Sequence, residues 1–195
     1  MAGPGDRGVA GLLSALAEAP DFDSAASFFL TQLAEIAATQ RACLLQFDAT
    51  HENLEFVASV GFDTPPRSIL ISAGDLSNPL VISALTIRPL RGMLPLPHRV
   101  LADVVPWIAL PLTQPRQRGS PELVSHVRGA ELLGSSTITF LETPERPLGA
   151  APAGVVLLQA EKATGAAIDD AIEIVALASP VLARLASLED AREAG

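Results

Sequence analysis

The side chains best suited to chemistry in this chain are a single cysteine and three histidines. Cys43 lies in the apolar run Ala-Cys-Leu-Leu, where a free cysteine behaves as a small buried hydrophobe. One cysteine can form neither an internal disulfide nor a thiolate cluster for zinc or iron–sulfur. His51, His98 and His126 lack a carboxylate or second histidine at metal-ligand spacing. We therefore predict no metal site.

Paired carboxylates and nucleophile motifs do not point to catalysis. Asp169 and Asp170 precede an apolar helical pattern, so they fit the amino end of a helix, whose dipole favours acidic residues. No serine lies in a Gly-x-Ser-x-Gly turn, and no Gly-rich phosphate loop occurs. We predict that the chain is not an enzyme and has no catalytic residues.

Three arginines, one histidine and the only tryptophan are the best candidates for a ligand site: Arg88, Arg91, His98, Arg99 and Trp107. The arginines could hold an anionic ligand through paired hydrogen bonds, and Trp107 offers a stacking wall and an indole N–H donor. In the alternative interpretation, the arginines are solvated loop residues and Trp107 fills the core.

The carboxyl-terminal segment carries the strongest indication of a partner. Its apolar residues follow two adjacent helical stripes, which together exceed the usual apolar width of a surface helix. We predict that one stripe covers the domain's own sheet and that the other forms a homodimer interface. The interface stripe consists of Ala171, Ile174, Ala178, Val181, Leu185 and Leu188. The alternative is one broad face buried within a single subunit.

Charge and composition limit the partners. The formal net charge is −9, with 13 basic residues and no dense basic cluster, so nucleic acid is not expected as a partner. The amino terminus lacks a signal-peptide pattern, and acidic residues interrupt the apolar segment 166–178, so we expect no membrane span and a cytoplasmic location.

Periodicity and turn residues predict one domain over residues 9–191, after a disordered tail at 1–8 and with an insertion at about 114–153. We expect a short helix around residues 9–16, followed by an amphipathic helix from Asp21 to Thr39. A helix from Pro79 to Ile87 should precede an irregular crossing segment. Helices are also expected at 122–133 and 166–191. The expected strands span residues 42–47, 54–60, 68–72, 104–113, 137–141 and 154–160.

Several of these segments together resemble a GAF domain. Residues 21–48 are similar to the family's opening, in which an amphipathic helix leads through Thr-Gln-Arg-Ala into an apolar strand ending in Asp48. Residues 54–61, with their closing Ser-x-Gly, resemble its second strand. Residues 107–112, ending in Pro-Leu, resemble its central strand, and residues 154–159 with the terminal helix resemble its last strand and helix.

The resemblance implies an α/β (α+β) fold with a central antiparallel sheet of about five to six strands. The amino- and carboxyl-terminal helices would pack on one face and often pair across a dimer. Family members hold small ligands on the opposite face, and some bind haem through a histidine near the position of His98. Members that bind bilins use a Cys-His pair, which this chain lacks.

The expected function is a regulatory sensor or input domain of a bacterial signalling protein. It would dimerise through its terminal helices and act on a downstream output module, with a small-molecule ligand on the opposite sheet face. The alternative is a ligand-free dimerisation or protein-docking module whose pocket has collapsed, which abundant aliphatic residues favour.

Overall fold

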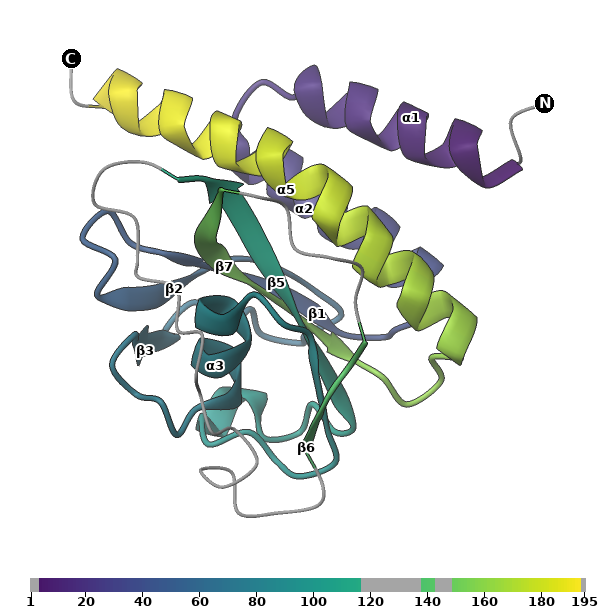
Figure 1. The fold of residues 1–195 in the computed structure, drawn as a ribbon, viewed down its shortest axis with the longest axis vertical. Coiled ribbons are helices and arrows are strands. Elements are labelled where there is room, and N and C mark those ends of the chain that lie inside the picture. The colour runs from purple at the N-terminus through teal and green to yellow at the C-terminus, as the bar shows by residue number, and fades with distance from the viewer. Residues whose placement is uncertain (1–3, 117–137, 143–148, 194–195) are drawn as a thin grey trace.

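A curled antiparallel sheet of seven strands forms the centre of the computed structural model, which describes residues 4–116, 138–142 and 149–193 (Figure 1). The strand order is β3-β2-β1-β7-β5-β4-β6. Every pair of neighbouring strands is antiparallel. The strands are β1 (Ala42–Phe47), β2 (Asn53–Val60), β3 (Leu70–Ser72), β4 (Leu90–Gly92), β5 (Trp107–Pro115), β6 (Ile138–Phe140) and β7 (Ala150–Gln159).

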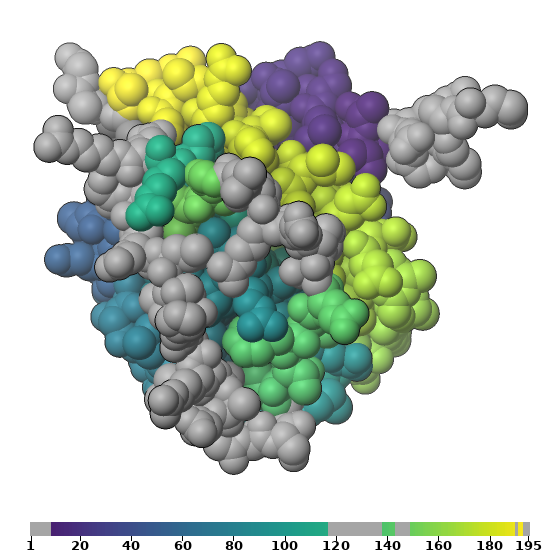
Figure 2. Space-filling view, in the orientation of Figure 1, coloured from purple at the N-terminus to yellow at the C-terminus, as the bar shows by residue number. Residues whose placement is uncertain are grey.

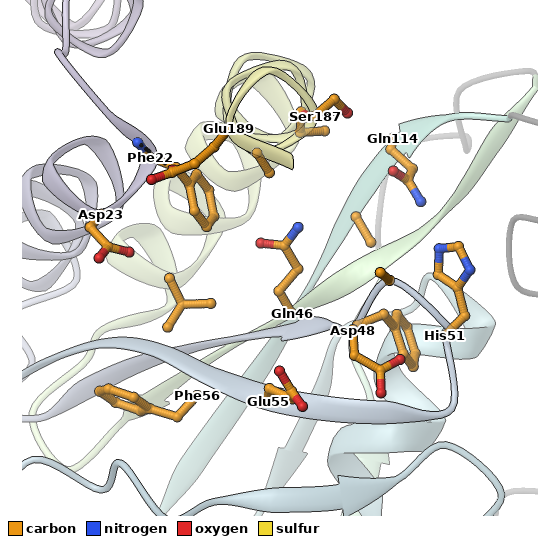
Figure 3. Close-up of a pocket in the computed structure, with 16 residues that line it drawn as sticks. Phe22, Asp23, Gln46, Asp48, His51, Glu55, Phe56, Gln114, Ser187 and Glu189 are labelled. Carbon is orange, nitrogen blue, oxygen red and sulfur yellow. Dashed lines mark hydrogen bonds between the residues drawn. The ribbon is translucent and has the colours of Figure 1, made fainter. Parts of the chain in front are cut away.

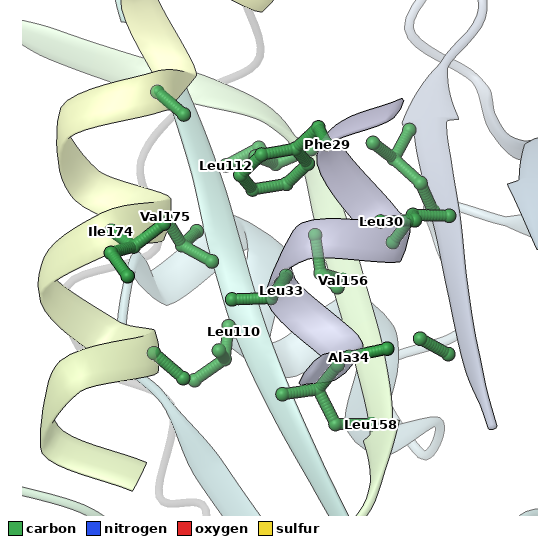
Figure 4. Close-up of a cluster of buried hydrophobic side chains, with 14 of the residues drawn as sticks. Phe29, Leu30, Leu33, Ala34, Leu110, Leu112, Val156, Leu158, Ile174 and Val175 are labelled. Atoms are coloured by element: carbon green, nitrogen blue, oxygen red, sulfur yellow. The ribbon is translucent and has the colours of Figure 1, made fainter. Parts of the chain in front are cut away.

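Two helices, α2 (Phe22–Ile36) and α5 (Gly165–Glu193), cover one face of this sheet, and α1 (Pro4–Ala17) packs on these two helices. Asp21 begins α2 as its N-cap, because its side chain accepts a hydrogen bond of 2.7 Å from the backbone N–H of Ser24. Phe29 and Leu33 of α2 then pack among Leu110, Val156 and Ile174, in a core between helices and sheet (Figure 4). The predicted placement of both terminal helices on one face is confirmed.

The opposite face carries α3 (Pro79–Thr86) and the short 3-10 helix η1 (Arg99–Leu101). Asn78 caps α3 by accepting a 3.0 Å hydrogen bond from Leu80 N–H, and Pro79 occupies the first turn, where its missing N–H costs nothing. All eight residues of α3 are buried. They form a second core with Trp107, Leu101 and the inner side chains of β5 and β7.

Local sequence patterns predicted most elements, and the main differences lie at edges. β1 has the predicted bounds, β2 begins one residue earlier, and α3 follows its cap as expected. The crossing segment contains the additional strand β4, which raises the strand count from the predicted five to six to seven. β4 has only three residues, which is too few to show an alternation of apolar and polar side chains in the sequence. It forms a strand because β5 and β6 supply hydrogen-bonding partners on its two sides.

Two boundaries need correction, and one predicted helix is not described. α1 begins at Pro4, so the predicted disordered tail at 1–8 is wrong from that residue onward; proline is tolerated at the first turn of a helix. Pairing of β5 with β7 continues to Pro115 and Ala150, so the insertion begins later and ends earlier than predicted. The predicted helix at 122–133 lies outside the described residues.

Helix α5 spans 29 residues and dominates one side of the molecule. Its atoms form a continuous band on the surface beside α1 (Figure 2). By length and composition alone, Gly165–Glu189 would be long and apolar enough to cross a membrane, although we predicted no such segment. Its apolar side packs on the sheet, and Asp169, Asp170 and Glu173 are exposed. This is the arrangement of a core helix.

Candidate functional site

Trp107, the proposed stacking wall of a ligand site, is fully buried in the core beneath α3. Its indole N–H donates a 2.8 Å hydrogen bond to the carbonyl oxygen of Leu94. Gly92 lies over the ring so closely that a Cβ atom there would come within 2.1 Å of Trp107 Cζ2. The indole ring is therefore packed, and its N–H is hydrogen-bonded, inside the protein. This agrees with the alternative interpretation, in which Trp107 fills the core.

Arg91 and Trp107 lie on neighbouring strands, but their side chains point to opposite faces of the sheet. Arg91 is paired with Ile108, which belongs to the core under α2 and α5. Trp107 is paired with Gly92 and belongs to the core under α3. Directly opposed residues of an antiparallel pair share a face, so Arg91 and Trp107 cannot line one pocket. The prediction that they act together is wrong.

The other predicted ligand residues do not converge either. The Arg88 guanidinium lies 3.9 Å from the centroid of the Phe140 ring, in a cation–π contact that covers this ring. Arg99 is exposed on η1. His98 is half-buried, and its Nδ1 atom is buried without a hydrogen-bond partner among the described residues. Haem binding through His98 stays a prediction.

The stripe of α5 predicted to form a dimer is largely buried within the subunit. Ala171, Ile174 and Ala178 pack in the core between α5 and the sheet, so for these three the predicted interface is wrong. Val181 and Leu185 are half-buried against the same core. The second stripe is buried as well, at Val175 and Leu182 among others. One broad face is therefore used inside the subunit, because α5 packs on β5 and also contacts α2 and α1.

The apolar residues that α5 exposes lie on its outer side. Leu177 is 43% exposed and Leu188 is 48% exposed. Of the six predicted interface residues, only Leu188 is fully available to a partner.

A hollow of about 490 Å³ lies between the β1–β2 hairpin and the facing ends of α2 and α5 (Figure 3). We call it the hairpin–helix hollow. Gln46 points into it from β1, and Phe22 from the first turn of α2. Ala153, Ala183 and Ala186 line it with short side chains that leave the space open. The remaining lining residues are Asp23, Phe47, Asp48, Ala49, His51, Glu55, Phe56, Val57, Gln114, Ser187 and Glu189.

Carboxylates surround this hollow, and no lysine or arginine is among the described residues that line it. Glu189 of α5 accepts a 3.1 Å hydrogen bond from the backbone N–H of Phe22, which joins the end of α5 to the start of α2. Glu55 lies opposite Gln46 in the β1–β2 pair, so both face the helices.

Asp48 organises the hairpin turn at the edge of the hollow. Its carboxylate accepts 2.9 Å hydrogen bonds from the Glu52 backbone N–H and from the side chains of Thr50 and Asn53. Desolvation raises the pKa of Asp48, but hydrogen bonds from Asn53, Thr50 and the Glu52 backbone outweigh it, and the pKa lies below its ordinary value. Asp48 is therefore charged at neutral pH.

A second, shallower groove of about 630 Å³ continues along β2. It shares Phe22, Asp23, Phe56 and Val57 with the hollow and extends to Arg67. Val57 is the extra residue of a β-bulge, because Leu44 is paired with Ala58 and Leu45 with Phe56.

Comparison with known proteins finds likeness in structure alone. No family model and no curated sequence matches the chain. The GAF domain of a Coxiella burnetii phosphoenolpyruvate-protein phosphotransferase has a TM-score of 0.64 at 12% identity, over 98% of this chain and 97% of that one. The corresponding Acinetobacter domain has a TM-score of 0.62 at 10% identity, over 96% and 97%. The GAF domain of a putative sensor histidine kinase from Pseudomonas syringae pv. tomato has a TM-score of 0.57 at 13% identity, over 98% and 93%.

These matches cover nearly the whole chain, with TM-scores above 0.6 for the two phosphotransferase domains. The chain has the GAF fold. Within this GAF fold, Cys43 is fully buried, and burial raises the pKa of its thiol to about 12. Cys43 is thus protonated at neutral pH and packs as a small hydrophobe, as predicted.

The described part of this GAF fold contains no group of three or more His, Cys, Asp and Glu residues arranged to hold a metal ion. Its most developed polar site is the hairpin–helix hollow, which sequence reasoning missed. Asp23, Glu55 and Glu189 belong to three elements separated by more than a hundred residues in total, so no spacing pattern connects them. The only local signal was the acidic start of α2 after its cap.

Proposed function

We propose that this GAF fold is a regulatory input domain of a signalling protein and that α5 carries its output. The observation behind this proposal is the position of α5, which packs on α1, α2 and β5 before it reaches the carboxyl-terminal end of the described chain. A shift in any of these elements therefore reaches α5 directly. The structural matches also include domains of a methyl-accepting chemotaxis protein and of a Stigmatella aurantiaca phytochrome, which have signalling names.

The proposed domain is a cytoplasmic homodimer that acts on a downstream output module. Its interface lies on the outer side of α5, around Leu177 and Leu188, because these two leucines are the large apolar residues that α5 leaves exposed. They are eleven residues apart, which is three helical turns, and so lie on one side of the helix. Arg184 is exposed between them.

The dimer is tested with Leu177→Glu and Leu188→Glu combined. We expect light scattering at tens of micromolar to show a dimer for the original chain and a monomer for the double variant, since four carboxylates, two from each subunit, would be buried at the interface. The midpoint of thermal unfolding of the monomeric double variant should resemble that of variants with substitutions at other exposed positions. Thr64→Glu, which places a carboxylate on an exposed loop, is the control and should remain dimeric. A monomeric original chain would refute the proposed dimer.

A second candidate function is a docking module with no ligand on the α3 face. The full burial of α3 and the satisfied indole of Trp107 favour it. A ligand site needs converging polar groups around a cavity, and the predicted ligand residues do not converge there.

A ligand screen separates the two candidates. Under the second, cyclic nucleotides, amino acids and haem should leave both the unfolding midpoint and the Trp107 emission maximum unchanged. A compound that binds the folded state raises the midpoint by mass action, and one that enters the α3 face should also shift the emission of this single tryptophan. A compound with both effects would exclude the second candidate.

A further inference from the structure

The hairpin–helix hollow combines carboxylates, apolar side chains and an amide in one space. Asp23 on α2, Glu55 on β2 and Glu189 on α5 supply carboxylates from three separate elements. Phe22 supplies a half-buried aromatic ring and Val57 an apolar side chain, whereas the ring of Phe56, which is paired with Leu45, packs against the core on the α3 side. Gln46 supplies an amide that points into the space between them (Figure 3).

Several of these polar groups are unengaged. Within the described residues, the side chains of Asp23, Glu55 and Gln46 form no hydrogen bond or ion pair with another side chain or with the backbone. Glu189 uses one oxygen for the Phe22 N–H and keeps acceptor capacity on its carboxylate. The hollow therefore presents acceptors and negative charge, and the part of its lining that the structure describes includes no basic residue.

Charge complementarity decides what can occupy this space. A hollow lined by one sign of charge concentrates ions of the opposite sign. An ammonium group can donate charge-assisted hydrogen bonds to the Glu55 carboxylate and to the Gln46 side-chain carbonyl, and it is also attracted to the face of an aromatic ring. Phe22 and Val57 leave an apolar wall that a bare metal ion would not use, whereas an organic body would bury surface against it.

We propose that the hairpin–helix hollow binds a small organic cation, an ammonium group attached to an apolar body. Its volume of about 490 Å³ lies within the usual range for small-ligand sites. The ligand would contact Phe22 at the start of α2 and Ser187 and Glu189 near the end of α5. The proposal that the hollow binds a cation does not rest on the proposed signalling function. The proposal that binding acts through α5 does rest on it.

The test uses the whole chain and phenethylamine, which is protonated at pH 7, with 2-phenylethanol as a neutral probe of similar shape. Backbone amide NMR should show that phenethylamine perturbs Gln46, Glu55 and Ser187 in a saturable manner. The neutral alcohol should bind at least about fivefold more weakly, because it cannot form the charge-assisted contacts with the carboxylates. Raising the salt concentration from about 0.05 to 0.5 M should weaken binding of the cation.

Paired variants assign the binding to the hollow. Asp23→Asn with Glu55→Gln should weaken phenethylamine binding about five- to tenfold, whereas Glu52→Gln should leave it unchanged. Glu52 is exposed on the same hairpin but does not line the hollow. An unchanged Trp107 emission spectrum will show that each variant is folded, because this tryptophan lies in the core on the other sheet face.

Three results would overturn the proposed site: no saturable shifts with phenethylamine, equal affinity for the alcohol, or equal losses with Glu52→Gln and with the double variant. If phenethylamine binds but neither the dimer nor α5 changes, the proposed site stands. Only its link to the proposed signalling function is then refuted.

Discussion

Trp107→Ala should lower the free energy of unfolding by about 3–5 kcal/mol, the usual cost of removing a large aromatic side chain from a packed core. Trp107 is fully buried among the residues of α3, β5 and β7, and it also loses the indole hydrogen bond to Leu94. Urea unfolding followed by circular dichroism measures the change, since the variant has no tryptophan to report fluorescence.

Leu70→Ala is the control for this experiment. Leu70 is 58% exposed on the edge strand β3, so its truncation should change the free energy of unfolding by no more than about 0.5 kcal/mol. A loss below about 1 kcal/mol for Trp107→Ala would show that the α3 face is loosely packed. Such a result would restore the interpretation of Trp107 as part of a ligand pocket.

Trp107→Ala also tests whether the space beneath α3 is already filled in the original chain. Removal of the indole should leave an apolar cavity beneath α3, and apolar cavities of this kind stay dry and take up small aromatic molecules. Added indole should therefore raise the unfolding midpoint of Trp107→Ala but not that of the original chain. If indole stabilises both equally, the cavity exists before the substitution.

Gly154→Ala should lower the free energy of unfolding by about 3 kcal/mol, the upper part of the range for overpacking a core. Gly154 lies in β7 between β1 and β5, and a Cβ atom there would come within 2.2 Å of the Leu45 carbonyl oxygen and 2.9 Å of Gln46 Cα. Both contacts involve backbone in the middle of the sheet, so neither can be relieved by turning a side chain.

Two other glycines serve as controls for Gly154→Ala. At Gly74 the nearest atom to a Cβ would be Ser72 Oγ at 3.6 Å, an ordinary contact. At Gly165, the first residue of α5, nothing lies within 4 Å. Gly74→Ala should be nearly neutral, and Gly165→Ala should stabilise the protein by up to about 0.5–1 kcal/mol because alanine is the better helix former. Equal losses at all three positions would contradict the close approach of β1 and β7.

The amino-acid sequence by itself determined the elements whose signals are local. Asp21 before a helical apolar pattern predicted the start of α2, and Asn78-Pro79 predicted the start of α3. The apolar run at 42–47 predicted β1 with its observed bounds. Caps and periodicity act over one or two turns, so they can be read without knowing what each element packs against. Their order, with the motifs at their ends, was sufficient to indicate the GAF fold.

Tertiary structure decided which surfaces these elements share. The sequence showed two apolar stripes on α5, but only packing against α2 and the sheet revealed that most of both stripes is buried or half-buried and that Leu177 and Leu188 remain exposed. Likewise, strand register placed Arg91 and Trp107 on opposite faces, which proximity in sequence could not reveal. The hairpin–helix hollow depends on three elements distant in the chain. Such contacts are set by long-range register and helix docking, for which a linear pattern carries no signal.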